Sequence, residues 1–279
     1  MVWGPDSTRA AVPPAEAALP PDADGAPEGA EEGVHGFRLR DAFIIIAATL
    51  VGQFLGVIGY GAVLYLTGDG TVQDLLWKIQ HDPFRNHMVV VSGFCGYLAM
   101  LLWIVHLLRG RRITPSGIGL VRAGGGWFAL VLLLFFALKG LSVWLMTFLD
   151  EATIEASYRT MDGLVGKETL WAAGSALLVV AIAPFLEEVA FRGALYQGLS
   201  RHMPRLVAAG IATLGFAAIH LQYALAGGVV AVVTTAQVLL LGAALMFLYM
   251  KSRSLWPGIA LHALNNGVSL IFLFAVAQP

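Results

Sequence analysis

The sequence is poor in the residues that soluble and disulfide-linked proteins rely on. Its 279 residues include one cysteine and 13% charged residues, against 58% hydrophobic residues. A soluble domain has about 25% charged and about 45–50% apolar residues. The single cysteine, Cys95, excludes disulfide bonds within the chain and cysteine-based metal sites. A net charge of −1 without any basic run gives no indication of nucleic-acid binding.

Long runs without charge are the main feature that is present. Asp, Glu, Lys and Arg are all absent from residues 42–68, 86–108, 206–250 and 254–279. A helix needs about 20 apolar residues to cross the ~30 Å hydrocarbon core of a bilayer. The sequence therefore predicts an all-α, polytopic transmembrane helical bundle with a polar intramembrane cavity. We expect spans near 42–66, 87–108, 126–149, 171–199, 204–221, 228–250 and 255–277. The charge-free run 206–250 can be divided into spans differently at the pair Gly227-Gly228. The sequence therefore predicts either seven or eight membrane segments.

The amino-terminal segment has a different composition. Residues 1–36 contain six of the twelve prolines, and seven acidic residues against one arginine. Such a segment cannot bury enough apolar surface to fold, so we predict a disordered tail over residues 1–37 and a transmembrane domain over 38–279.

Positive charges alternate between the two sets of loops. One set holds ten Lys and Arg residues (38, 40, 109, 111, 112, 122, 201, 205, 251 and 253), and the other holds four (78, 85, 159 and 167). Cytoplasmic loops carry the excess of Lys and Arg, so the first set and the amino terminus are predicted to be cytoplasmic. The single cysteine and the many Ala and Gly residues favour a bacterial source. We therefore expect a multi-pass protein of the bacterial inner membrane.

Three charged groups lie directly after an apolar stretch. Residues 169–186 contain no Asp, Glu, Lys or Arg, and Glu187, Glu188 and Arg192 follow them. A charge at the bilayer centre costs about 2.5–3.5 kcal/mol on insertion scales, so such a cluster indicates a function. Glu188 and Arg192 are four residues apart on one helix face and are predicted to form an ion pair. Glu187 then becomes the candidate general base.

Two histidines and an asparagine occur in later charge-free runs. His220 lies within the run 206–250, and His262 and Asn266 share one face of the last helix. Each of these groups alone also has a structural interpretation, as a packing residue or as an interhelical hydrogen bond. Lys139 is interpreted as a partnered or snorkelling residue outside the site. The combination predicts one polar cavity built by three helices.

The order of these motifs resembles the CAAX protease and bacteriocin-processing family of intramembrane proteases, including the type II CAAX prenyl endopeptidase. The matching motifs are Glu-Glu-x-x-x-Arg from residue 187, Phe-x-x-x-His from residue 216, and His-x-x-x-Asn from residue 262. The resemblance covers about residues 168–270. It implies a bundle of about eight helices around a conical cavity that water can enter.

The resemblance also implies roles for these residues. Glu187 and His220 would activate a water molecule for attack on a peptide carbonyl. His262 and Asn266 would stabilise the oxyanion, and the predicted ion pair would fix the first glutamate. The implied partners are the lipid bilayer and a peptide or prenylated, membrane-associated protein substrate.

No cofactor is expected, because an asparagine four residues after His262 suits a carbonyl oxygen better than a metal. Zinc is the alternative, and its ligands would be Glu187, His220 and His262. The His-Glu-x-x-His pattern of another zinc protease class is absent.

Two functions of other classes stay open. One is a non-catalytic membrane partner or immunity protein, although every residue implied to be catalytic is present. The other is a proton-coupled transporter that uses Glu187 and His220 as a relay. Many transporters are built from internal repeats, and none is visible in this sequence.

Overall fold

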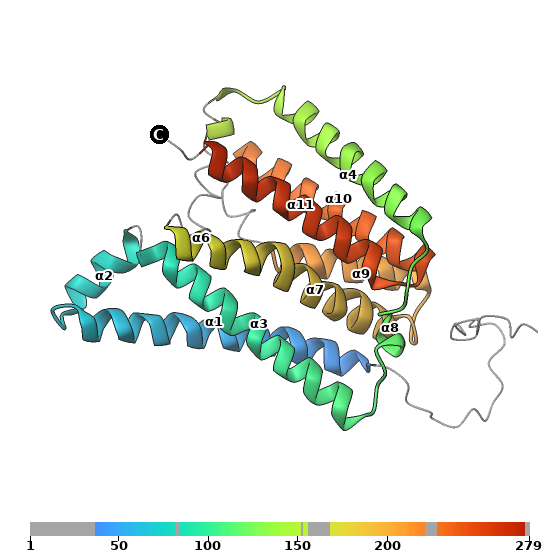
Figure 1. Ribbon diagram of the computed structural model, residues 1–279, viewed down its shortest axis with the longest axis horizontal. Helices are drawn as coiled ribbons and strands as arrows, with labels where there is room; N and C mark the ends of the chain where they lie inside the picture. Colours follow the sequence, from blue (N-terminus) through green and yellow to red (C-terminus); the bar gives the residue numbers. More distant parts are fainter. Residues whose placement is uncertain (1–36, 82–83, 152, 156–167, 221–227, 277–279) are drawn as a thin grey trace, which may run out of the picture. The chain divides into compact units, whose positions relative to one another are not determined.

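The computed structural model describes residues 37–81, 84–151, 153–155, 168–220 and 228–276, and the described elements are helical throughout (Figure 1). The long helices are α1 (Leu39–Thr67), α3 (Phe84–Gly110), α4 (Gly125–Met146), α10 (Gly228–Ser252) and α11 (Leu255–Val276). Shorter elements are α2 (Val72–Gln80), the 3₁₀ turn η1 (Ser116–Ile118) and α9 (Arg205–Ala218).

One further long helix, Thr169–Leu199, is a composite of five segments. These are α6 (Thr169–Ala176), the π-helical segment η2 (Leu177–Ile182), α7 (Ala183–Glu188), a second π-helical segment η3 (Val189–Tyr196) and α8 (Gln197–Leu199).

The predicted fold class is confirmed. Within the described residues, six helices are long and apolar enough to cross a membrane, and the chain is a multi-pass membrane protein. The seventh apolar helix, α9, has 14 residues. At 1.5 Å per residue it is about 21 Å long, which is shorter than the ~30 Å hydrocarbon core.

The predicted amino-terminal tail falls almost entirely outside the described residues. Its last residue, Phe37, is described and is fully buried in the main hydrophobic core. The predicted boundary between the tail and the transmembrane domain stays a prediction.

Pro184 lies between the two π-helical segments, at the start of α7. Proline has no N–H to donate, and its ring clashes with the carbonyl of the residue four positions earlier. The wider π turn of η2, directly before α7, accommodates this clash. Single π turns within α-helices are frequent at functional sites.

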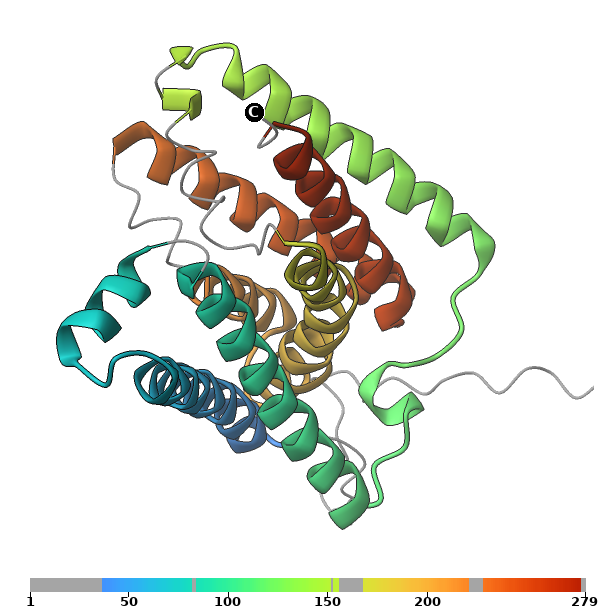
Figure 2. The ribbon, with the colours of Figure 1, turned by 60° about the vertical axis from the view of Figure 1, so that its left-hand side comes forward.

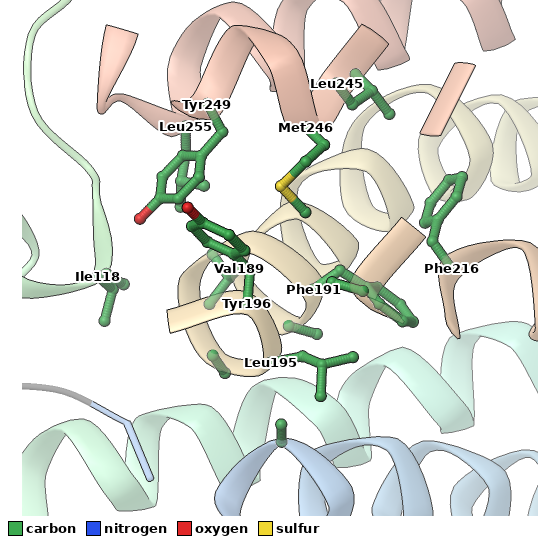
Figure 3. Close-up of a cluster of buried hydrophobic side chains, with 14 of the residues drawn as sticks. Ile118, Val189, Phe191, Leu195, Tyr196, Phe216, Leu245, Met246, Tyr249 and Leu255 are labelled. Atoms are coloured by element: carbon green, nitrogen blue, oxygen red, sulfur yellow. The ribbon is translucent and has the colours of Figure 1, made fainter. Parts of the chain in front are cut away.

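The composite helix is central to the described bundle, because α1, α3, α9 and α11 all pack against it (Figure 2). Every residue of η3 is buried. Figure 3 shows η3 side chains facing those of α9 and α10, and the Phe191 and Phe216 rings meet edge to face at 5.5 Å. This apolar packing fixes the helix that carries the two glutamates.

The loops that carry more positive charge meet at one end of the helices. The Leu255 N–H donates to the Gly119 carbonyl at 2.8 Å, and the Ser254 hydroxyl donates to the Val121 carbonyl at 2.6 Å. Arg111 pairs with Asp41 in the first turn of α1. The predicted grouping of these loops is therefore observed. The cytoplasmic assignment of this end stays a prediction.

Candidate active site

Glu187 and the two histidines come together from three helices. Glu187 is on α7 and is 3% exposed, His220 follows the last turn of α9, and His262 is on α11. The Nε2 atom of His220 lies 4.0 Å from Glu187 Oε2, and the Nε2 atom of His262 lies 3.8 Å from the same oxygen. Two imidazoles thus face one oxygen of one buried carboxylate.

The backbone orients the His220 ring. Its Nδ1 atom lies 2.9 Å from the Phe216 carbonyl oxygen, one helical turn earlier. A carbonyl oxygen only accepts hydrogen bonds, so Nδ1 must carry the hydrogen. In the neutral ring, Nε2 then presents a lone pair toward Glu187, which suits a group that takes a proton from water.

Glu188 and Arg192 form the predicted ion pair, and both side chains are fully buried. The Arg192 Nη1 atom donates to Glu188 Oε1 at 2.8 Å, and Nη2 donates to the Gly242 carbonyl at 3.0 Å. The guanidinium also lies 4.7 Å from the centre of the Phe216 ring. The Nδ1 atom of His262 is 3.5 Å from the same Glu188 oxygen. The pair therefore supports His262 as well as the glutamate helix.

Tyr97 is a site residue that the sequence did not indicate. Its hydroxyl, on α3, donates a hydrogen bond to Glu187 Oε1. A buried tyrosine hydroxyl usually has a partner, so a tyrosine in a charge-free run was the available signal. One oxygen of Glu187 is thus held by a phenol, while the other faces the histidines.

Asn266 lies beside the histidines, but its side chain bonds away from Glu187. Its Nδ2 atom donates to the Val179 carbonyl of η2 at 3.0 Å, and its Oδ1 atom faces the Asn265 amide at 3.3 Å. An amide NH₂ has two hydrogens, so one N–H of Asn266 is left to donate to a ligand.

A cavity of about 230 Å³ opens beside these groups. Its walls come mainly from α4, α10 and α11, and they include Lys139, Ser142, His220, Thr234, Gln237, His262, Asn265, Asn266 and Ser269. Sequence reasoning placed Lys139 outside the site, whereas it lies in this wall. It has the partner that was predicted, because Nζ donates to the Ser269 hydroxyl at 2.9 Å.

Zinc bound by Glu187, His220 and His262 would need these three side chains close together. Zinc holds nitrogen and oxygen ligands at about 2.0–2.2 Å, which brings neighbouring ligand atoms to about 3.3–3.5 Å of each other. The two imidazole nitrogens lie 3.8 and 4.0 Å from the Glu187 oxygen. Among the described residues, no three His, Cys, Asp or Glu side chains are arranged to hold a metal ion. The present arrangement does not fit zinc, and we derive no reaction step through a metal.

Residues 169–268 match a protein-family model described as "Type II CAAX prenyl endopeptidase Rce1-like". Residues 169–268 are therefore similar to the Rce1-like family, and we call them the Rce1-like domain. This match confirms the family resemblance of the motifs, and it spans all six residues that the motifs selected. No curated protein and no solved structure matched the chain.

The site extends beyond the Rce1-like domain. Tyr97 on α3 and Lys139 on α4 both precede residue 169, where the family match begins. The helices before the domain therefore contribute a hydrogen bond to the candidate base and a cation to the cavity.

Proposed function

We propose that the chain is an intramembrane endopeptidase that hydrolyses a peptide bond in CAAX-type or other membrane-associated substrates. The observation that carries this proposal is the convergence of two imidazoles on one buried Glu187 oxygen. The match of residues 169–268 to the Rce1-like family supports the reaction class.

In the proposed mechanism, Glu187 and His220 bind one water molecule between them. Their atoms are 4.0 Å apart, which is too long for a direct hydrogen bond and leaves room for a bridging water. The water attacks the peptide carbonyl carbon as its proton passes to this pair. The C–N bond then breaks, and the same proton goes to the leaving amine.

The oxyanion formed in that step needs hydrogen-bond donors. We assign this role to the second N–H of Asn266 and to His262 with a hydrogen on both ring nitrogens, so that Nε2 donates to the oxyanion while Nδ1 faces Glu188. Donors that are already oriented in a dry site stabilise developing charge without reorganisation. The ion pair of Glu188 and Arg192 is proposed to hold the neighbouring Glu187 and His262 in place.

The proposed setting is the bacterial inner membrane, with the amino terminus in the cytoplasm. His262 is seven residues after Leu255, the first residue of α11. At 1.5 Å per residue, the site lies about 10 Å from the end that carries more positive charge. A substrate would then be cleaved near the cytoplasmic face.

The proposal is tested with farnesylated and non-prenylated peptides offered to the purified protein in detergent. The wild type is expected to cleave, and Glu187→Gln and His220→Ala are each expected to lower kcat at least about 100-fold, the lower end of the contribution of general acid–base catalysis. His202→Ala, outside the cavity, is the matched control. Equal cleavage by the wild type and both site variants would refute these roles. Proton flux in liposomes without any cleavage would favour the transporter.

Metal dependence is measured in the same assay. We propose a metal-free reaction, so activity should persist in excess phenanthroline. If phenanthroline abolishes the activity and added zinc restores it, Glu187, His220 and His262 would instead be assigned as metal ligands.

A further inference from the structure

A second cavity, of about 390 Å³, lies where the first turn of α1 meets the last turns of α3. Within the described residues, its walls share no residue with the cavity of the candidate active site. The walls include Arg40, Asp41, Ile44, Trp103, His106 and Arg111. The proposed peptidase reaction uses none of these side chains, so this cavity needs an explanation of its own.

The cavity carries more positive charge than its one carboxylate neutralises. Arg111 donates twice to the Asp41 carboxylate, and the Arg38 backbone N–H donates to it at 2.7 Å. The Nε atom of Arg40 lies 3.8 Å from the same carboxylate, which is too long for a hydrogen bond, and the Arg40 side chain is 65% exposed. The charge of Asp41 is thus balanced by Arg111. The guanidinium of Arg40 is left to pair with an anion.

The cavity lies at the depth of lipid headgroups. Helix α1 has 29 residues, so it is about 43 Å long at 1.5 Å per residue. This length matches a bilayer of about 40–45 Å with its headgroup regions included, and Arg40 is the second residue of the helix. On α3, the rings of Trp103 and His106 lie 5.2 Å apart in the cavity wall. Tryptophan is enriched in this layer of the membrane.

An apolar stripe leads from the cavity along the exposed face of α1. Ile44 lines the cavity and is exposed, and the exposed residues Val51, Leu55 and Ile58 follow it at intervals of seven, four and three residues. These intervals keep all four side chains on one face of the helix. In a membrane, exposed aliphatic side chains at this depth contact acyl chains. The stripe therefore favours a ligand with acyl chains over a free phosphate ion.

We propose that this cavity binds an anionic glycerophospholipid, with the headgroup phosphate paired to Arg40 and an acyl chain along the stripe that begins at Ile44. A headgroup that carries its own cation would bind more weakly, because the excess charge of the cavity is already positive. Basic pockets between transmembrane helices on the cytoplasmic side bind anionic headgroups, and this cavity lies at the end with more positive charge. The inference does not depend on the proposed peptidase activity.

The experiment titrates the purified protein in detergent with phosphatidylglycerol or with phosphatidylcholine of the same acyl chains, and native mass spectrometry measures the bound lipid. The wild type is expected to bind phosphatidylglycerol at least about fivefold more tightly, since one positive charge near the membrane surface contributes about 1 kcal/mol. Arg40→Gln should bind phosphatidylglycerol only as tightly as phosphatidylcholine, and Arg40→Lys should keep the preference. Arg201→Gln is the matched control, because it removes an exposed arginine of the same set of loops outside the cavity.

Wild-type affinity of Arg40→Gln for phosphatidylcholine would show that this variant is folded. Equal affinity of the wild type for the two lipids would overturn the anionic site, and so would an unchanged preference in Arg40→Gln. An equal loss of phosphatidylglycerol affinity in Arg201→Gln would show only a general attraction to this end of the protein, and would also overturn it.

A third ligand distinguishes a lipid from a soluble phosphate compound. Glycerophosphoglycerol has the headgroup of phosphatidylglycerol without the acyl chains, and it is expected to bind far more weakly than the lipid. Binding as tight as that of phosphatidylglycerol would overturn the assignment of a lipid.

Discussion

At the residue scale, the two oxygens of Glu187 have different surroundings. Oε1 accepts from the Tyr97 hydroxyl, and Oε2 faces His220 and His262. This division leaves one oxygen for chemistry and uses the other to fix the carboxylate. The side chain is almost fully buried, so its orientation depends on these partners.

Removal of the phenol tests the importance of that orientation. A hydrogen bond to a charged group contributes about 1.5–3 kcal/mol, so Tyr97→Phe is expected to lower kcat/KM roughly tenfold or more. Tyr65→Phe changes an exposed tyrosine near the end of α1 and should have no effect. Steady-state kinetics on one peptide checks both. Wild-type kcat/KM in Tyr97→Phe would show that the phenol does not support the base.

The site residues that the sequence predicted and those that it missed differ in how far along the chain their bonding partners lie. Glu188 and Arg192 are one helical turn apart, so their ion pair follows from local spacing. Tyr97 and its partner are 90 residues apart in the chain. Lys139 and its partner are 130 residues apart. Contacts of this kind depend on how the helices pack, and one sequence does not contain that information.

At the element scale, the helices follow from the charge-free runs, but the π-helical segments do not. The predicted span 126–149 corresponds to α4 at Gly125–Met146, whereas the predicted span 204–221 is the shorter α9 at Arg205–Ala218. A π turn is stabilised by neighbours as well as by Pro184. In η2, for example, the Val179 carbonyl accepts from Asn266 on α11. Apolar periodicity alone does not reveal such a partner.

The contact between α1 and α3 depends on small residues. Gly52 and Gly56 are four residues apart on α1, which brings them onto the face that meets Gly96 and Ser92 of α3. A Cβ atom added at Gly52 would lie 2.6 Å from the Cys95 carbonyl oxygen. This separation is too short for any side chain, so glycine permits the close approach of the two backbones.

We therefore expect Gly52→Val to push α1 away from α3. Overpacking of this kind costs roughly 1–3 kcal/mol, which should appear as a lower free energy of unfolding in detergent. Gly59→Val is the control, because a Cβ atom at Gly59 meets nothing within 4 Å. Equal stability of the two variants would show that the close α1–α3 contact does not contribute to stability.

At the scale of the whole molecule, the candidate site is built both by residues that precede residue 169 in the sequence and by residues that follow it. The Rce1-like domain supplies the carboxylates, the histidines and the asparagine, and the earlier helices supply Tyr97 and Lys139. The loops with more positive charge meet at the end where α11 begins. Which aqueous compartment the substrate enters from therefore depends on the orientation of this end.

Ten Lys and Arg residues in this set of loops, against four in the other, predict that this end is cytoplasmic. The test uses a Cys95→Ala background with a new cysteine at one of two exposed, uncharged positions. Gln73→Cys on α2 should react with a membrane-impermeant maleimide in intact spheroplasts. Ser116→Cys, in η1 within the set of loops that holds ten Lys and Arg residues, should react only after permeabilisation. Neither change alters a positive charge, so the orientation itself should be preserved. The reverse labelling pattern would place the candidate site near the outer face, and substrates would then have to reach it from outside the cell.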